Sequence, residues 1–283
     1  MRGGLFPGQG VDAGTVHAAL TQSALLERAD DVLGFDLRAA VERCLDRARP
    51  TLPTDLAQPA LFVAGLVSHG SQGEPFDVYA GHSVGEYTAL AAAGALSPED
   101  GLRLVCTRGR AMRDAGRAAP GGMAAVKGLT AGELGDICNR TGTVVANDNS
   151  PAQLVIAGAD EALAEAARMI HAAGGRSLLL PVEGAFHTEA MAPAADAVRD
   201  ALDHTRVVMP RVPVVSNVTA RLYRAPGEIR KMLVRQLTER VRFRESVEWM
   251  SRTGVTDFVD LGPGRTAGKL ASATVAAGDR VDA

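Results

Sequence analysis

Ser83 is the residue whose surroundings point most directly to chemistry. It lies at the centre of the pentapeptide GHSVG at 81–85, a GxSxG pattern. The residue pattern predicts a strand at 76–80 just before it and an alanine-rich helix at 84–93 just after it. Such a strand-to-helix turn projects a serine hydroxyl, and the helix N-terminus offers free N–H groups to an oxyanion. The simpler alternative is a glycine-rich turn with a capping serine.

A serine becomes a strong nucleophile when a neighbouring base accepts its proton, and histidine is the usual base. Among the six histidines, His187 follows an expected strand at 177–182 and opens an expected helix. His82 is adjacent to Ser83, so its side chain is expected to point elsewhere. The other four lie in helix-like segments and are expected on solvated faces: His17, His69, His171 and His204. His187 is therefore the candidate base, with a surface histidine as the alternative.

Glycine-rich segments elsewhere do not fit nucleotide-binding loops. The segment FPGQG at 6–10 would let the backbone around Gln9 approach a ligand closely. Its glycine spacing is GxGxxxG rather than GxGxxG, and the chain contains no Walker A sequence. A dinucleotide-binding Rossmann domain is therefore disfavoured.

The order of expected elements predicts an α/β protein with a largely parallel sheet. Further strands are expected at 212–216 and 257–261, and Ser97 should cap a helix that runs to about residue 115. Strands separated by helices of this length usually form a parallel sheet.

A second pattern begins after a glycine- and proline-containing break near residue 120. Its expected order is strand 123–126, helix 131–139, strand 143–146, strand 153–157, helix 161–173 and strand 177–182. That β-α-β-β-α-β order is typical of a ferredoxin-like α+β unit. We therefore expect an inserted subdomain at 120–184 within a main catalytic domain formed by 1–119 and 185–283.

Composition narrows the class of protein. The 283-residue chain has a net charge of −3, which disfavours a general nucleic-acid binder. Its longest apolar run, 60–67, is too short to span a membrane, and the N-terminus does not resemble a signal peptide. The three cysteines form no CxxC pair, so we expect a cytoplasmic protein without disulfides or a metal site.

Five short motifs occur in a fixed order along the chain: FPGQG at 6–10, GHSVGEY at 81–87, RG at 108–109, AFH at 185–187 and LGPG at 261–264. In this order they resemble malonyl-CoA:acyl-carrier-protein transacylases and the acyltransferase domains of fatty acid and polyketide synthases. The resemblance covers residues 5–272. It implies an α/β-hydrolase-like domain with a parallel sheet plus a ferredoxin-like insert, as the element pattern also predicts.

The resemblance implies roles in catalysis for particular residues. Ser83 matches the nucleophile that becomes the acyl-enzyme, and His187 matches the general base. The backbone N–H groups of Gln9 and Val84 match the oxyanion hole. Gln236 matches the glutamine whose main-chain carbonyl orients the imidazole.

It also implies residues that contact the substrate. Arg108 matches the arginine that grips a carboxylate, and a planar guanidinium suits this because it can donate two parallel hydrogen bonds. Malonyl carries a free carboxylate, whereas acetyl does not. Phe186 matches the malonyl-selective members, since its ring would crowd an α-methyl branch. Asn217 matches a family asparagine near the site.

The implied activity moves a malonyl group from coenzyme A to the phosphopantetheine thiol of an acyl carrier protein through a seryl acyl-enzyme. Malonyl-CoA and the carrier are the implied partners, and the coenzyme A thioester is a substrate, so no cofactor is expected. Three alternatives stay open: a specialised trans-acting polyketide acyltransferase with another acyl group, a hydrolase that edits acyl carriers, and an inactive docking module. The segments Val11-Asp12 and 239–243 depart from the family pattern near the substrate mouth.

One stretch of the chain is strongly basic. Residues 221–244 carry eight basic and two acidic side chains, a balance of +6. This stretch would attract an acidic carrier protein by long-range electrostatics. An ordinary solvated helix face explains the same pattern equally well.

Overall fold

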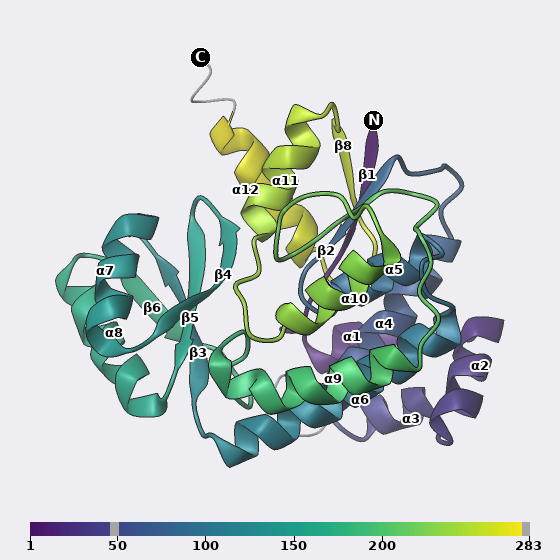
Figure 1. Ribbon diagram of the computed structural model, residues 1–283, viewed down its shortest axis with the longest axis horizontal. Coiled ribbons are helices and arrows are strands. Elements are labelled where there is room, and N and C mark those ends of the chain that lie inside the picture. Colours follow the sequence, from purple (N-terminus) through teal and green to yellow (C-terminus); the bar gives the residue numbers. More distant parts are fainter. Residues whose placement is uncertain (46–50, 279–283) are drawn as a thin grey trace.

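The larger sheet places the N-terminal strand at its centre. The computed structural model describes residues 1–45 and 51–278, and its first sheet has the order β7-β2-β1-β8 with all pairs parallel (Figure 1). Its strands are β1 Arg2–Phe6, β2 Val78–Gly81, β7 Val214–Val215 and β8 Asp257–Asp260. The expected α/β class is confirmed. The sequence pattern does not predict β1, because two glycines in RGGLF lower its strand propensity.

Helices surround this sheet. Their bounds are α1 Ala13–Ala19, α2 Ala24–Leu33, α3 Leu37–Glu42, α4 Thr54–Gly70, α5 Gly85–Ala92, α6 Pro98–Ala118, α9 Ala192–Asp203, α10 Pro226–Arg235, α11 Phe243–Arg252 and α12 Thr266–Gly278, with the 3₁₀-helix η1 Glu189–Met191 before α9. Within the two described ranges, no helix is both long and apolar enough to cross a membrane.

Side chains of the parallel strands alternate between two buried faces. Leu5, Val78 and Ala80 belong to the apolar cluster formed with α11 and α12. Phe6 and Tyr79 belong to the larger cluster formed with α4, α5 and α6. Burial on both faces explains why β2, with the sequence VYAG, carries apolar side chains in succession.

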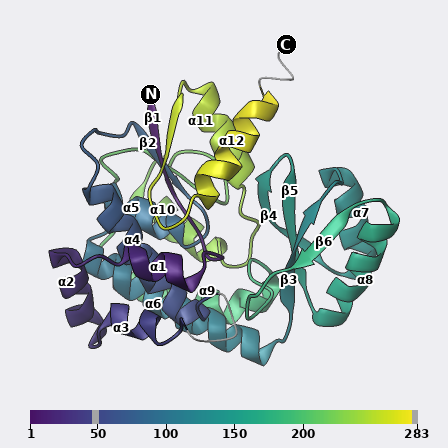
Figure 2. The same ribbon diagram turned by 180° about the vertical axis from the view of Figure 1, so that it is seen from behind.

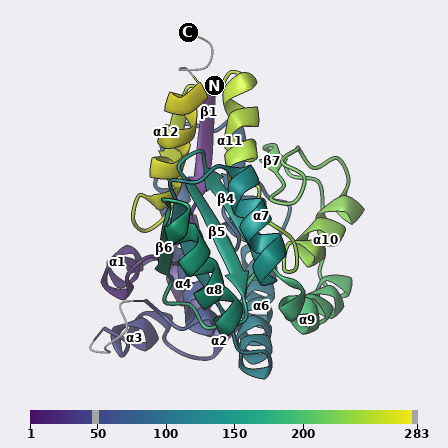
Figure 3. The ribbon, with the colours of Figure 1, turned by 90° about the vertical axis from the view of Figure 1, so that its left-hand side faces the viewer.

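The smaller sheet is antiparallel and lies to one side of the larger one. Its elements are β3 Gly122–Lys127, α7 Ala131–Thr141, β4 Val144–Ser150, β5 Gln153–Gly158, α8 Asp160–Ala172 and β6 Arg176–Leu179. The strand order β4-β5-β3-β6 and the two helices confirm the expected ferredoxin-like unit. Figure 3 shows α7 and α8 on its outer face. The exact division at 120 and 184 stays a prediction.

The ends of two helices follow directly from local sequence. Ser97 accepts a hydrogen bond from the Asp100 N–H at the start of α6, as the sequence predicts. Thr130 and Glu133 form a reciprocal capping box at the start of α7.

Backbone and side-chain bonds join the small sheet to the larger unit. Strand β4 contacts both α11 and α12, which lie beside it in the view from behind (Figure 2). The Val241 N–H donates to the Ala146 carbonyl, and the Asp148 N–H donates back to the Val241 carbonyl. Arg244 forms two hydrogen bonds of 2.9 Å with the buried Asp148 carboxylate. These contacts fix the inner face of the small sheet against the end of the parallel strands.

Candidate active site

Ser83 lies on a sharp turn between β2 and α5, as the GxSxG pattern predicts. Its φ is +53°, a left-handed conformation that is uncommon for a residue other than glycine. An added Cβ at Gly81 would overlap the backbone of Gly85, and one at Gly85 would overlap the Phe6 carbonyl. The two glycines therefore allow β1, the turn and the helix to approach closely enough to hold Ser83 in this conformation.

His187 is in position to exchange a proton with Ser83. Its Nε2 lies 2.9 Å from Ser83 Oγ, and its Nδ1 lies 2.7 Å from the Gln236 carbonyl oxygen. Because a carbonyl can only accept, Nδ1 carries the hydrogen and Nε2 accepts from the serine hydroxyl. Burial, together with the nearby Arg108 charge, lowers the pKa of His187 to about 3. The imidazole is therefore neutral and able to accept a proton.

Arg108 is completely buried beside Ser83. Its Nη2 donates to Ser83 Oγ at 3.0 Å and to Gln236 Oε1 at 2.9 Å, and its Nη1 donates to Gln58 Oε1 at 2.8 Å. Its Nε has no partner, and no carboxylate of the described chain forms an ion pair with it. Glu86 acts on this charge at longer range, with the Gln236 side chain between them, and no described carboxylate bonds the guanidinium directly. Because a buried charge without a direct partner is costly, this guanidinium is suited to an anionic ligand.

Asn217 holds the turn that carries Ser83. Its Oδ1 accepts from the Ser83 N–H at 2.8 Å, and its Nδ2 donates to the Gly81 carbonyl at 2.5 Å. Asn217 thus bridges both sides of the turn, which places the sequence-predicted asparagine directly at the site.

Glu86 is a site residue that the sequence analysis missed. Its carboxylate accepts from the Asn217 N–H at 2.9 Å, from the Tyr223 hydroxyl at 2.6 Å and from Gln236 Nε2. Burial raises the pKa of Glu86 to about 7, against the effect of these donors. An acidic residue inside an otherwise apolar, alanine-rich helix was the signal that could have identified it.

Gln9 and Val84 place backbone N–H groups near Ser83. Val84 follows the serine at the start of α5, and Gln9 lies in the loop after β1. The hydrogen bonds of the described chain assign no acceptor to either N–H group. The Gln9 side chain is held by the Thr54 hydroxyl, which donates to its Oε1 at 2.9 Å.

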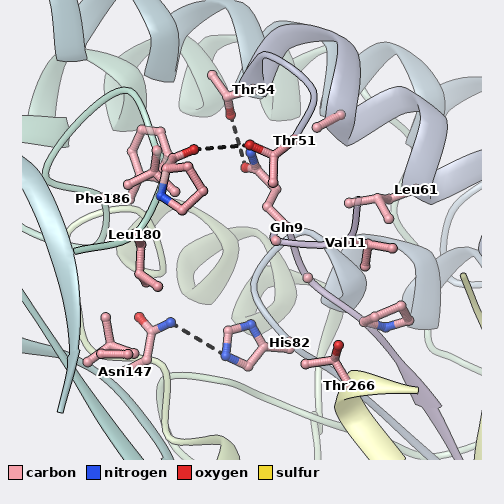
Figure 4. Close-up of a pocket in the computed structure, with 18 of the residues that line it drawn as sticks. Gln9, Val11, Thr51, Thr54, Leu61, His82, Asn147, Leu180, Phe186 and Thr266 are labelled. Atoms are coloured by element: carbon pink, nitrogen blue, oxygen red, sulfur yellow. Dashed lines mark hydrogen bonds between the residues drawn. The ribbon is translucent and has the colours of Figure 1, made fainter. Parts of the chain in front are cut away.

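A pocket of about 310 Å³ opens between the two sheets and reaches the site through Gln9, His82 and Phe186, while Ser83, His187 and Arg108 do not line it. Gln9 and Val11 line one side of it, and Leu180 and Phe186 line the other (Figure 4). Its floor includes His82, the neighbour of Ser83 in sequence, whose side chain turns away to bond Asn149 at 2.8 Å. The lining is mostly apolar, as expected for a site that binds an organic ligand.

Two expectations need correction or qualification. His69 does not lie on a solvated face: its ring is half-buried and bonds the Tyr79 hydroxyl at 2.7 Å, because α4 packs this side against β2. Half of the basic side chains in the stretch 221–244 form ion pairs in the described structure: Arg235, Arg240, Arg242 and Arg244. Three of their acidic partners, Asp148, Glu245 and Glu248, lie outside the stretch and reduce its local balance from +6 to +3. This reduction weakens the attraction of the stretch for a carrier protein.

Metal-ligating side chains do not cluster in the part of the chain that the structure describes. No group of three or more His, Cys, Asp or Glu residues there could hold a metal ion. The three cysteines, Cys44, Cys106 and Cys138, are free thiols.

Known proteins share the sequence and the fold over nearly the whole chain. Residues 5–276 match the family model of the acyl transferase domain. Malonyl CoA-acyl carrier protein transacylase of Bacillus subtilis is 37% identical over 275 residues, which cover 92% of this chain and 86% of that protein. Polyketide biosynthesis protein ThaF of Burkholderia thailandensis is 38% identical over 92% of this chain, which spans only 23% of ThaF.

A solved structure extends this likeness to three dimensions. A malonyl-transacylase in complex with its type II polyketide-synthase acyl-carrier protein superposes with a TM-score of 0.86 and 34% identity, covering 97% of this chain and 93% of that one. The chain therefore belongs to the malonyl-CoA:acyl-carrier-protein transacylase family of acyl transferase domains.

Proposed function

We propose that this enzyme transfers a malonyl group from coenzyme A to the phosphopantetheine thiol of an acyl carrier protein, through an acyl-enzyme on Ser83. The observation that carries the proposal is the buried Arg108 guanidinium, which touches Ser83 Oγ and has no carboxylate partner within the described ranges. A malonyl carboxylate would bond the guanidinium directly, which Glu86 does not, while its thioester carbonyl lies at the serine.

The first half-reaction loads the enzyme. Ser83 Oγ attacks the thioester carbonyl and gives its proton to His187 Nε2, while the Gln236 carbonyl holds the opposite N–H of the ring. The N–H groups of Gln9 and Val84 stabilise the negative oxygen of the tetrahedral intermediate. When the intermediate collapses, the carbon–sulfur bond breaks, and the coenzyme A thiolate takes the proton from His187.

The second half-reaction follows the same path with another thiol. The phosphopantetheine thiol gives its proton to His187 and attacks the malonyl ester carbonyl. Collapse breaks the bond to Ser83 Oγ, which recovers a proton from His187. The cycle uses only protein groups and two thiols, so we propose that no metal or redox cofactor takes part.

Acyl selectivity comes from charge and from shape in this proposal. Arg108 binds the free carboxylate, which an acetyl group lacks. Phe186 is 4% exposed and lies at the wall of the pocket, where its ring would crowd an α-methyl branch. Malonyl satisfies both conditions.

The relatives support this activity and leave two pathways open. The Bacillus subtilis relative is named a malonyl CoA-acyl carrier protein transacylase, and the solved neighbour is bound to an acyl-carrier protein. ThaF is named for polyketide biosynthesis, so a polyketide carrier is a second candidate acceptor. We place the enzyme in the cytoplasm, where its free thiols would persist.

Labelling with radioactive malonyl-CoA tests the proposal. We expect about one malonyl group per wild-type chain, none on Ser83→Ala, and release of the label to a holo carrier protein rather than to water. Release mainly to water would identify the editing hydrolase instead. A chain that takes up no malonyl label but forms an adduct with another acyl thioester would identify the specialised acyltransferase. A chain that forms no adduct with any acyl thioester would identify a docking module.

A further inference from the structure

A line of buried hydrogen bonds runs from Arg108 to the loop that carries Gln9. Arg108 Nη1 donates to Gln58 Oε1 at 2.8 Å, Gln58 Nε2 donates to Thr54 Oγ1 at 3.1 Å, and the Thr54 hydroxyl donates to Gln9 Oε1 at 2.9 Å. Figure 4 shows the Thr54 side chain directed toward Gln9 at the upper edge of the pocket. Every donor points in the same direction along the line, an arrangement in which hydrogen bonds strengthen one another.

Helix α4 builds the middle of this line. Thr54 and Gln58 are one helical turn apart, so their side chains lie on the same face. Thr54 is 2% exposed and Gln58 is fully buried, so water does not compete for the two bonds of Gln58, whereas the Thr54–Gln9 bond is part-buried at the edge of the pocket. The Thr54 N–H is itself held by Glu183 Oε2 at 3.2 Å, which fixes the start of the helix. Both side chains are therefore held in place.

The two ends of the line are groups with different tasks in the proposed reaction. Arg108 would bind the distal carboxylate of malonyl, and the backbone N–H of Gln9 would stabilise the oxyanion at the thioester carbonyl. If the guanidinium moved toward a bound carboxylate, the side chains of Gln58 and Thr54 would move with it through their hydrogen bonds. The loop that carries Gln9 would then move as well. An acetyl group, which lacks the carboxylate, would produce no such shift.

We propose that Thr54 and Gln58 are positioning residues that couple recognition of the malonyl carboxylate to placement of the Gln9 N–H. This inference rests on the proposed malonyl transfer. It predicts that carboxylate recognition raises the turnover of malonyl, in addition to its binding, because the oxyanion donor reaches its best position only when Arg108 is engaged.

Thr54→Val tests the coupling with little change in shape, and Thr54→Ser is the matched control that keeps the hydroxyl. For Thr54→Val we expect kcat for malonyl transfer to fall about 5- to 30-fold, because buried donors and acceptors lose their partners. KM and acetyl transfer should change by less than about threefold, since neither depends on the coupling. Thr54→Ser should stay within about twofold of the wild type.

A double-mutant cycle then separates coupling from a general structural effect. When Arg108→Ala is already present, adding Thr54→Val should lower kcat for acetyl transfer or residual malonyl transfer by less than about twofold. The chain of hydrogen bonds from Arg108 to Gln9 is already interrupted in that background. Equal losses with both substrates, or additive losses in the double variant, would overturn the inference. If Thr54→Val does not fold, Gln58→Met is measured in the same cycle, with the same outcomes deciding.

Detection of the malonyl adduct on the wild-type enzyme distinguishes failure of the coupling from failure of the proposed malonyl transfer. Intact-mass detection of malonyl on Ser83, with unchanged kcat in Thr54→Val, would reject only the coupling. A wild-type chain that forms no malonyl adduct would reject the proposed function, and the coupling would fall with it.

Discussion

Arg108 Nη2 and Ser83 Oγ lie 3.0 Å apart, so a buried cation donates a hydrogen bond to the proposed nucleophile. The same guanidinium helps to lower the pKa of His187. A bound carboxylate would compensate this charge and thereby raise the pKa of His187. Substrate binding would then strengthen the base at the moment when it must accept the serine proton.

Ser83→Ala is expected to abolish the covalent malonyl adduct and leave the fold unchanged. The substitution removes one hydroxyl from a turn whose backbone is held by Asn217. Intact-mass spectrometry after mixing with malonyl-CoA measures the adduct, and thermal unfolding checks the fold. An adduct of malonyl mass on Ser83→Ala would place the nucleophile elsewhere.

The pH dependence of acylation is expected to differ from that of an ordinary histidine. Only the neutral imidazole accepts the serine proton, and the pKa of His187 is lowered from 6.5 to about 3. At limiting malonyl-CoA, the acylation rate should therefore stay level as the pH falls from 8 to 5. With an unshifted pKa, the rate would fall about tenfold for each pH unit below 6.5. Rapid-quench mass spectrometry of the acyl-enzyme measures this rate.

Two variants show which titrating group causes any fall of the acylation rate at low pH. Arg108→Ala removes a cation that faces His187, so the pKa of His187 should rise. The pH below which the acylation rate falls should then move upward, as measured with acetyl-CoA. Glu86→Gln removes a carboxyl group at the site whose pKa is raised to about 7. A wild-type acid limb centred at 6.5 that persists in Glu86→Gln would contradict the buried, neutral His187.

Glu86→Gln is expected to lower kcat about 10-fold or more. The NH2 group of the new glutamine would face Gln236 Nε2, where a Glu86 oxygen now accepts a hydrogen bond, so two donors would oppose each other. Gln236 orients both His187 and Arg108, so its displacement should act on catalysis more than on KM. Steady-state kinetics of malonyl transfer measure the separate effects on kcat and KM. Tyr223→Phe removes one donor to the same carboxylate and is the milder control.

Stability supplies an independent check on Glu86. The pKa of Glu86 is raised to about 7, so the folded state binds more protons than the unfolded state between the ordinary value of 4.5 and 7. The contribution of Glu86 to the free energy of unfolding is fully present below pH 4.5 and is lost as the pH rises through 7. The wild type should therefore lose more stability between pH 5 and 8 than Glu86→Gln does, measured by urea unfolding. Parallel curves would contradict the raised pKa.

The sequence predicts the parts of the site that arise from local geometry. The GHSVG turn and its flanking strand and helix are encoded within a few residues, so Ser83 could be identified before the structure was known. Likewise, the predicted capping residue Ser97 acts only on the first turn of its own helix.

Long-range contacts account for what the sequence could not predict. Gln58 bonds Arg108, and Glu86 bonds Gln236, but these residues come from separate helical segments and no local spacing relates them. Gln58 and Glu86 were therefore missed, and Gln236 was identified only through the family resemblance. Strand β1 was missed for a similar reason. Its glycines lower the local strand propensity, but β2 and β8 pair with it on both sides and the packed helices determine its conformation.

Gly81→Ala tests the close approach at the turn. The added methyl group would overlap the Gly85 backbone, so we expect a loss of about 2 kcal/mol or more in unfolding free energy and loss of acylation. Gly135→Ala, in helix α7 with open space around the new methyl, should instead stabilise the protein by about 0.5–1 kcal/mol. Urea unfolding measures both variants. A well-folded and fully active Gly81→Ala would refute the tight turn.

Arg108→Ala is expected to reduce the preference for malonyl over acetyl. A buried, charge-assisted pair with a carboxylate contributes about 2–4 kcal/mol, so the ratio of kcat/KM values should fall about 30- to 1,000-fold. Arg108→Lys should recover only part of it, because an ammonium group cannot reproduce the planar pair of donors. Both thioesters are measured with each variant.

Arg110→Ala is the matched control for this prediction, because Arg110 lies on the same helix and is exposed. It should leave both kcat/KM values within about twofold of the wild type, as is usual for an exposed side chain away from a site. If Arg108→Ala lowers malonyl and acetyl transfer equally, the guanidinium acts mainly by holding Ser83 and Gln236. A selective loss of malonyl transfer, restored in part by lysine, is the result that only carboxylate binding explains.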